Sequence, residues 1–105
     1  MFMSKVKKKD YIKVIDEKFV VPYAKGGGII KFEAWEYENI VVKYNMVYIN
    51  KNIFPNDNGR VFGYDNSHNF HHKHYFGQIS ELDDFIDYQE LVLRFKNDIK
   101  EFVKW

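Results

Sequence analysis

The sequence predicts an α+β fold, in which an antiparallel β-sheet of about five strands carries one long C-terminal helix packed on one face. The first observation is the alternation of apolar and polar residues through much of residues 11–79, which is the period of a half-buried strand. The second is a change to helical spacing from Phe85 onward. Because strands followed by one amphipathic helix are typical of α+β domains, we expect the helix to lie across the sheet.

The first two strands are expected on either side of a glycine-rich turn. Residues 11–21 are rich in β-branched and aromatic side chains, which favour extended backbone. The turn formers of residues 22–28 follow, including three consecutive glycines. Residues 29–37 then alternate apolar and polar side chains, so this strand should have one dry and one wet face.

The next three strands have a clear central member. Every even position from Ile40 to Tyr48 is apolar or aromatic, so one face of a strand at 40–50 should lie on the core. A loop is expected at 55–59, where every residue is a turn former. Shorter strands are expected at 60–66 and 73–79, joined by a loop through His68.

The C-terminal part of the chain has the spacing of an amphipathic helix. Ser80 and Asp83 have the form of a capping box at its start. Glu90 and Arg94 are placed to pair at i,i+4 on the outer face. We expect the apolar stripe to bury Phe95 against the even face of the 40–50 strand. The stripe consists of Phe85, Tyr88, Val92, Phe95, Ile99, Phe102 and Val103.

Length and composition predict one domain over residues 1–105. The 16 basic and 15 acidic residues nearly cancel, so the total charge does not indicate a nucleic-acid-binding protein. The absence of cysteine excludes disulfides, thiolate nucleophiles and Cys-ligated metals. No apolar run is long enough to span a membrane, and we expect a soluble cytoplasmic protein without membrane partners. Residues 1–9 are expected to form a flexible basic arm.

The four histidines of the chain lie within seven residues, at His68, His71, His72 and His74. Three explanations for this concentration stay open on residue chemistry alone. The histidines, with Asp65, could bind zinc or non-haem iron. They could supply an acid and a base for cleavage of RNA, which requires no metal. They could also be structural, stacking on neighbouring aromatic residues and making surface hydrogen bonds.

Two motifs around these histidines resemble a known family. Residues 57–66 end in Tyr64-Asp65-Asn66, and a His-His-Lys-His run follows at residues 71–74. Together with Tyr48-Ile49-Asn50 and Phe32-Glu33-Ala34-Trp35, they make the chain similar to the TumE family of bacterial and archaeal toxin–antitoxin proteins. Lys73 stands where many members have arginine, which keeps the charge but loses the bidentate fork.

The resemblance implies the toxin component of a type II toxin–antitoxin module, with a cognate helix-turn-helix antitoxin as partner. Our leading hypothesis is a small, metal-independent endoribonuclease that needs no cofactor and acts on an RNA substrate. A non-catalytic module that binds only its antitoxin and a His/Asp metal-dependent hydrolase are the alternatives. A homodimer is compatible with each of these functions.

The ribonuclease hypothesis assigns roles to nine residues. His72 and His74 are expected to be the acid and the base, because alternate residues of a strand share a face. Asp65 would orient one imidazole. The other expected catalytic residues are Arg60, which would stabilise the phosphorane, and Tyr64, which would stack on a base or donate a proton. The expected substrate-binding residues are Lys73, His68, His71 and Asn66.

Overall fold

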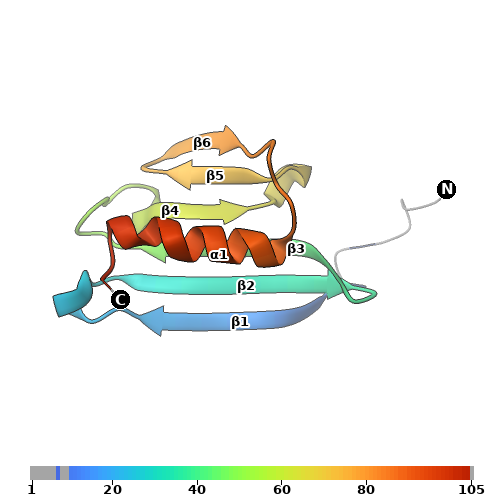
Figure 1. The fold of residues 1–105 in the computed structure, drawn as a ribbon, viewed down its shortest axis with the longest axis horizontal. Helices are drawn as coiled ribbons and strands as arrows, with labels where there is room; N and C mark the ends of the chain where they lie inside the picture. Colours follow the sequence, from blue (N-terminus) through green and yellow to red (C-terminus); the bar gives the residue numbers. More distant parts are fainter. Residues whose placement is uncertain (1–6, 8–9, 105) are drawn as a thin grey trace.

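The structure is a computed structural model that describes residue 7 and residues 10–104. Its six-stranded antiparallel sheet follows chain order, each strand pairing with the next, and one helix lies across it (Figure 1). The α+β prediction is therefore confirmed, with six strands instead of about five. The elements are β1 (Ile12–Val20), β2 (Ile29–Tyr37), β3 (Ile40–Ile49), β4 (Arg60–Asp65), β5 (His72–Tyr75), β6 (Gln78–Glu81) and α1 (Tyr88–Asp98).

The additional strand arises from a tight turn inside the segment expected to be one strand at 73–79. Phe76 and Gly77 both have positive φ, 48° and 80°, and they connect β5 to β6 in a two-residue hairpin. Such turns match the twist of the flanking strands and usually contain Asn-Gly or Asp-Gly. A bulky aromatic residue at the first position gave no turn signal in the sequence, although Gly77 permits the second.

Helix α1 begins later than its apolar spacing predicts. Its N-cap is Asp87, whose side chain accepts a hydrogen bond from the Glu90 backbone N–H. The predicted capping box at Ser80 and Asp83 is wrong, because Ser80 lies in β6 and an irregular segment separates it from the helix. The predicted pairing of Glu90 with Arg94 is confirmed at 2.9 Å.

The core lies between α1 and one face of the sheet. Phe95 is fully buried, with its ring 5.4 Å from that of Phe32 on β2 and 5.3 Å from that of Phe62 on β4. The predicted burial of Phe95 and Tyr44 is confirmed. Leu91, which was outside the predicted stripe, is buried, whereas Val92 is only half-buried. The helix is thus rotated slightly from the face that its spacing predicts.

The sheet separates two environments. Phe62 and Tyr64 of β4 contact Phe95, so they lie on the helix face of the sheet. Successive strand residues point to opposite faces, so Asp65 lies on the other side, which we call the open face because α1 does not cover it. Among the described residues no helix is long and apolar enough to cross a membrane. The predicted basic arm at 1–9 lies outside the described residues except for Lys7.

Candidate functional site

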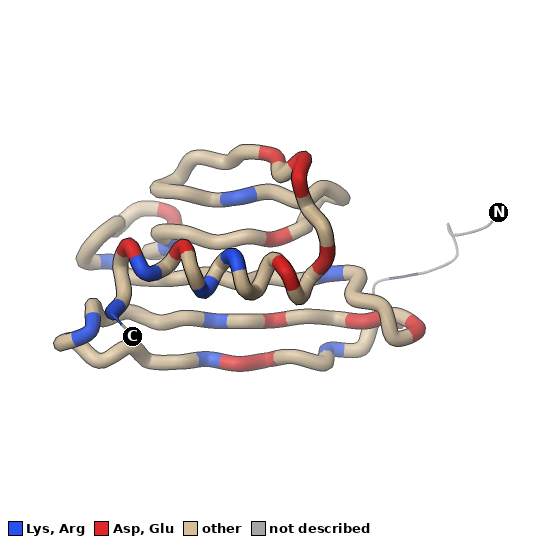
Figure 2. The backbone as a smooth tube through the Cα atoms, viewed as in Figure 1, with Lys and Arg blue, Asp and Glu red and all other residues tan. Residues whose placement is uncertain are grey.

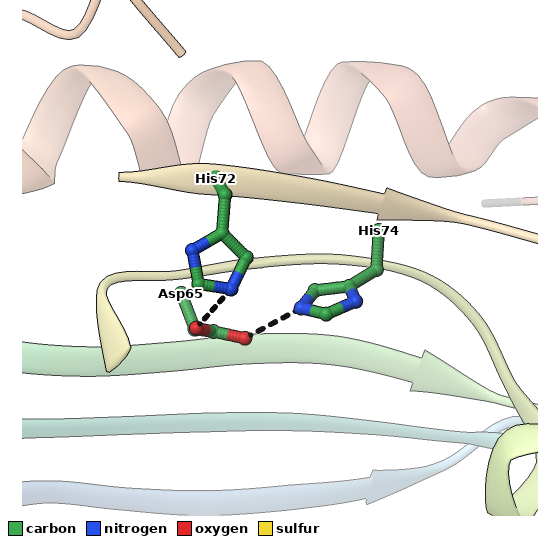
Figure 3. Close-up of side chains that lie close together, drawn as sticks. All are labelled: Asp65, His72 and His74. Atoms are coloured by element: carbon green, nitrogen blue, oxygen red, sulfur yellow. Dashed lines mark hydrogen bonds and ion pairs between the residues drawn. The ribbon is translucent and has the colours of Figure 1, made fainter. Parts of the chain in front are cut away.

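Asp65 joins two histidines on the open face of the sheet. The pairing of β4 with β5 places Asp65 opposite His72, and His74 follows two residues along the same face. Asp65 Oδ1 lies 2.8 Å from His72 Nε2, and its Oδ2 lies 2.9 Å from His74 Nε2 (Figure 3). Gly63, which is opposite His74, has no side chain to compete for this space. One carboxylate therefore bridges two imidazoles.

A β-bulge brings Arg60 to the same group. Strict alternation from Phe62 would place Arg60 on the helix face, but Tyr48 pairs with Phe62 and Ile49 with Arg60, so β4 has one extra residue between them. Such bulges redirect side chains. Arg60 Nη1 lies 3.4 Å from His74 Nε2 and 3.8 Å from Asp65 Oδ2. The cluster thus combines an anion, two imidazoles and a permanent cation.

The hydrogen bonds of Asp65 stabilise its ionised form. Burial by itself would raise the pKa of this carboxyl group, but hydrogen bonds from His74 and Ser67 and the charge of His72 hold it well below its usual range. Ser67 contributes both its backbone N–H, at 3.0 Å, and its hydroxyl, at 2.8 Å. Asp65 is therefore an anion throughout the physiological pH range.

The second ring nitrogens of the two histidines differ. His72 Nδ1 lies 3.1 Å from the Phe70 carbonyl oxygen, so both nitrogens of this ring face acceptors. Both contacts are hydrogen bonds only when both nitrogens carry a proton. His74 Nδ1 is buried without a hydrogen-bond partner, so a proton on Nε2 satisfies the contact with Asp65 and leaves Nδ1 with a free lone pair. The two imidazoles thus differ in the surroundings of Nδ1, which faces a carbonyl oxygen in His72 and has no partner in His74.

Tyr64 and Lys73 lie on the helix face, away from this cluster. The Tyr64 hydroxyl donates to Asp98 Oδ2 at 2.8 Å, and burial together with this bond raises the pKa of Tyr64. The Lys73 ammonium group lies 5.5 Å from the ring centroid of Phe62. The structure therefore does not bring these two predicted site residues together with Asp65, as the period of two along β4 and β5 explains.

The remaining predicted residues occupy other positions. His71 Nδ1 is hydrogen-bonded to the Tyr44 hydroxyl at 2.8 Å, and its ring stacks on Phe85 at 3.6 Å. Asn66 uses its side chain to pair with the backbone of β3, accepting from Tyr44 N and donating to Val42 O. His68 is exposed in the connection from β4 to β5. Only His72 and His74 of the four histidines contact Asp65.

The sequence of this chain matches the model of one protein family. The family model described as Toxin TumE matches residues 12–103, which include every residue of the Asp65 cluster. The chain belongs to the TumE toxin family. The resemblance inferred from the sequence motifs is therefore confirmed. Searches of curated proteins and of solved structures found no match.

Three residues outside the predicted set of site residues support the cluster in this TumE-family chain. Ser67 donates twice to Asp65, and the signal for it was the Asp-x-Ser spacing of a side-chain turn. Phe70 provides the carbonyl for His72 and places its ring 4.6 Å from the imidazole. Asp57 accepts from Arg60 Nε at 2.9 Å and from Nη2 at 3.1 Å.

The same three residues, Asp65, His72 and His74, offer ligand atoms within 4.8 Å of one another, which is close enough for a shared metal ion. A divalent cation would face the Arg60 guanidinium, which lies 3.4 Å from one ligand nitrogen. A histidine ligand usually donates its second N–H to an acceptor, and the Nδ1 of His74 has none. These contacts fit a hydrogen-bonded network better than a metal site.

A shallow depression of about 250 Å³ opens on the open face beside Arg60. Its lining combines two cationic side chains, Lys31 and Arg60, with the amide groups of Asn45 and Asn58. Asp57 is the acidic residue of this lining, and Arg60 already binds it. The depression therefore has the charge and hydrogen-bond donors to bind an anion next to the cluster of the TumE-family chain.

Proposed function

We propose that this TumE-family toxin is a metal-independent endoribonuclease whose active site is the group of Arg60, Asp65, His72 and His74. The observation that carries the proposal is the Asp65 carboxylate bridging the Nε2 atoms of two buried imidazoles. Buried ionised groups are costly unless they are paired, and buried carboxylates with a strongly shifted pKa are concentrated at functional sites.

The hydrogen-bond partners assign the acid and the base. His72, with acceptors beside both ring nitrogens, is assigned as the general acid. His74, with Nε2–H directed at Asp65 and Nδ1 without a partner, serves as the general base. Asp65 holds both rings and stabilises the positive charge that His74 acquires when it takes a proton.

The phosphodiester is proposed to bind in the depression beside Arg60. The edge of the guanidinium that now binds Asp57 through Nε and Nη2 is the bidentate edge that a phosphate group requires. Substrate phosphate would therefore replace the Asp57 carboxylate. Lys31 would provide a second cation at the same depression.

The proposed reaction is an attack by the neighbouring 2′-oxygen on phosphorus. In this step the buried His74 Nδ1 becomes accessible and takes the proton from the 2′-hydroxyl as the new O–P bond forms. His72 leaves one of its two present acceptors and gives that proton to the departing 5′-oxygen as the old P–O bond breaks. The products are a 2′,3′-cyclic phosphate and a 5′-hydroxyl. Arg60 neutralises the charge that develops on the phosphorane oxygens.

The proposal is tested with purified protein and with cells that express it without antitoxin. The double variant His72→Ala/His74→Ala is compared with Gln78→Ala, at an exposed position of β6 outside the cluster. We expect RNA cleavage and growth inhibition to fall by about 10² to 10⁴-fold in the double variant and to be unchanged in the control. Circular dichroism checks that both variants are folded.

The nature of the products separates the competing mechanisms. Cleavage should persist in EDTA, leave 2′,3′-cyclic phosphate ends, follow a bell-shaped pH dependence and fail on RNA with a 2′-O-methyl group at the cleaved position. A metal-dependent hydrolase would instead lose activity in EDTA and cut the methylated RNA. Growth inhibition that survives in the double variant, without any RNA cleavage, would favour the non-catalytic binding module.

Membership of a toxin family also suggests an antitoxin partner. We propose that this partner is a helix-turn-helix protein encoded beside the gene for this chain. Co-expression of the neighbouring reading frame should restore growth. Restoration by no neighbouring frame would contradict this part of the proposal, while leaving the test of RNA cleavage unaffected.

A further inference from the structure

A wide apolar groove lies on the helix face of the sheet, on the opposite side from the Asp65 cluster. It runs between β1 and α1 and has a volume of about 1070 Å³. Ile15 and Phe19 of β1 form one wall, and Val92 and Leu93 of α1 form the other. Phe19 is 50% exposed and Leu93 is 68% exposed, so large apolar side chains border open space here.

The groove exists because one helix cannot cover six strands. Five strand spacings extend over roughly 24 Å, whereas a helix with its side chains is about 10 Å wide. The helix packs over the strands that carry Phe32 and Phe62, which leaves the face of β1 uncovered (Figure 1). A second helix beside α1, at the usual interaxial distance of about 8–10 Å, would cover β1.

On the sheet face that carries α1, the uncovered regions on the two sides of the helix differ in polarity. On the β1 side the side chains that share this face include Ile15 and Phe19. On the far side, β6 pairs Ser80 with Lys73 and Gln78 with Tyr75, so this side is mostly polar. An exposed apolar patch bordered by polar groups is typical of a protein-binding surface. The apolar side is therefore the one that requires a partner.

The charges around the groove indicate the charge that its binding partner should carry. Four lysines line the groove, and Glu17 is the acidic residue of the lining. Figure 2 marks the basic and acidic positions along the backbone of α1 and β1. A second copy of this chain would bring the same lysines against them, and the lysine-rich residues 5–9 of the chain would be repelled as well. An acidic segment of a different protein has the complementary charge. The four lysines are Lys25, Lys96, Lys100 and Lys104.

The geometry points to an acidic amphipathic helix of the antitoxin as the occupant of this groove. The identity of this partner rests on the proposed toxin–antitoxin function. The apolar stripe of that helix would cover Phe19 and Leu93. Glutamates or aspartates beside the stripe would pair with Lys96 and Lys100, which are one helical turn apart on α1 and its extension. The backbone hydrogen bond from Lys104 N to Lys25 O closes one end of the groove and limits the length of the helix.

The test uses a phage-displayed library of 16-residue helical peptides with a fixed apolar stripe at i, i+3, i+4 and i+7. The remaining positions are randomised among Glu, Gln and Lys, and the library is panned on the immobilised full chain. We expect enriched peptides to have Glu beside the stripe. Synthetic versions of them should bind in solution, with an affinity that falls as salt rises.

Two variants locate the binding site, and two others serve as controls. Phe19→Asn and Lys96→Glu/Lys100→Glu should each weaken peptide binding by at least about tenfold, which corresponds to about 1.4 kcal/mol. Ile79→Asn is the matched control, because Ile79 is 61% exposed but lies on β6, far from the groove in the sheet order. The variant His72→Ala/His74→Ala should bind normally, so failure of the ribonuclease proposal does not affect this result.

Several results would overturn the inference. One is a set of selected peptides in which Glu is no more frequent than Lys beside the stripe. Another is peptide binding that survives Phe19→Asn, and a third is peptide binding that Ile79→Asn weakens as much as Phe19→Asn does. A wild-type dimer in sedimentation that Phe19→Asn converts to a monomer would show that a second copy occupies the groove instead.

Discussion

Asp65 is the residue on which the hydrogen bonds of the candidate site converge. It accepts from His74 and from both donors of Ser67, and it lies 2.8 Å from His72 Nε2 and 3.8 Å from Arg60 Nη1. Alternation along one strand was sufficient to predict that His72 and His74 share a face, whereas the β4–β5 register that places Asp65 opposite His72 required the structure. The same rule, applied to Tyr64 and Lys73, would have placed them on the opposite face.

Replacing Asp65 with Asn tests this convergence. The amide keeps the size of the carboxyl group, but one of the two imidazoles then faces an NH₂ donor where it now has an acceptor. We expect RNA cleavage to fall by about 10² to 10⁴-fold and the free energy of unfolding to fall by about 1–3 kcal/mol. Single-turnover cleavage and urea unfolding measure the two effects. Asp84→Asn, at an exposed carboxylate outside the cluster, should change neither, and cleavage at the wild-type rate in Asp65→Asn would remove Asp65 from the mechanism.

At the scale of the elements, long periodic segments were predictable and short-range turns were not. The strands at 29–37 and 40–50 match β2 and β3 closely, because period two over nine or ten residues is a strong signal. Two features depend on local backbone geometry that the residue types there do not indicate. They are the β5–β6 hairpin and the bulge in β4 that redirects Arg60. The Arg60 contact in the candidate site therefore required the structure.

The packing of α1 on the sheet depends on Phe95. Its ring contacts Phe32, Phe62 and Tyr64, so truncation would leave a cavity among three aromatic residues. We expect Phe95→Ala to lower the free energy of unfolding by about 3–5 kcal/mol in urea denaturation. Leu93→Ala, on the exposed side of the same helix, should change it by less than about 0.5 kcal/mol. A cost below about 1 kcal/mol for Phe95→Ala would mean that the helix packs differently.

At the scale of the whole molecule, the two proposed functions belong to opposite faces of the sheet. The Asp65 cluster lies on the open face, and the apolar groove lies between β1 and α1 on the other. A helix bound in the groove would leave the cluster itself uncovered. Antitoxin binding and RNA cleavage should therefore be separable by mutation, and any inhibition must come from parts of the antitoxin that extend beyond the groove.

The stability of the whole molecule should fall in two stages as the pH is lowered. Burial, followed by the nearby charge of His72, lowers the pKa of His71, and hydrogen bonds lower the pKa of Asp65 despite its burial. A group with a lower pKa in the folded chain binds fewer protons there than in the unfolded chain, so stability is lost as the pH falls below its ordinary value. That value is 6.5 for His71 and 3.8 for Asp65. Urea unfolding from pH 8 to pH 3 should show a first decline that is absent in His71→Gln and a second that is reduced in Asp65→Asn. A wild-type profile that stays flat between pH 7 and pH 5 would contradict the burial of a neutral His71.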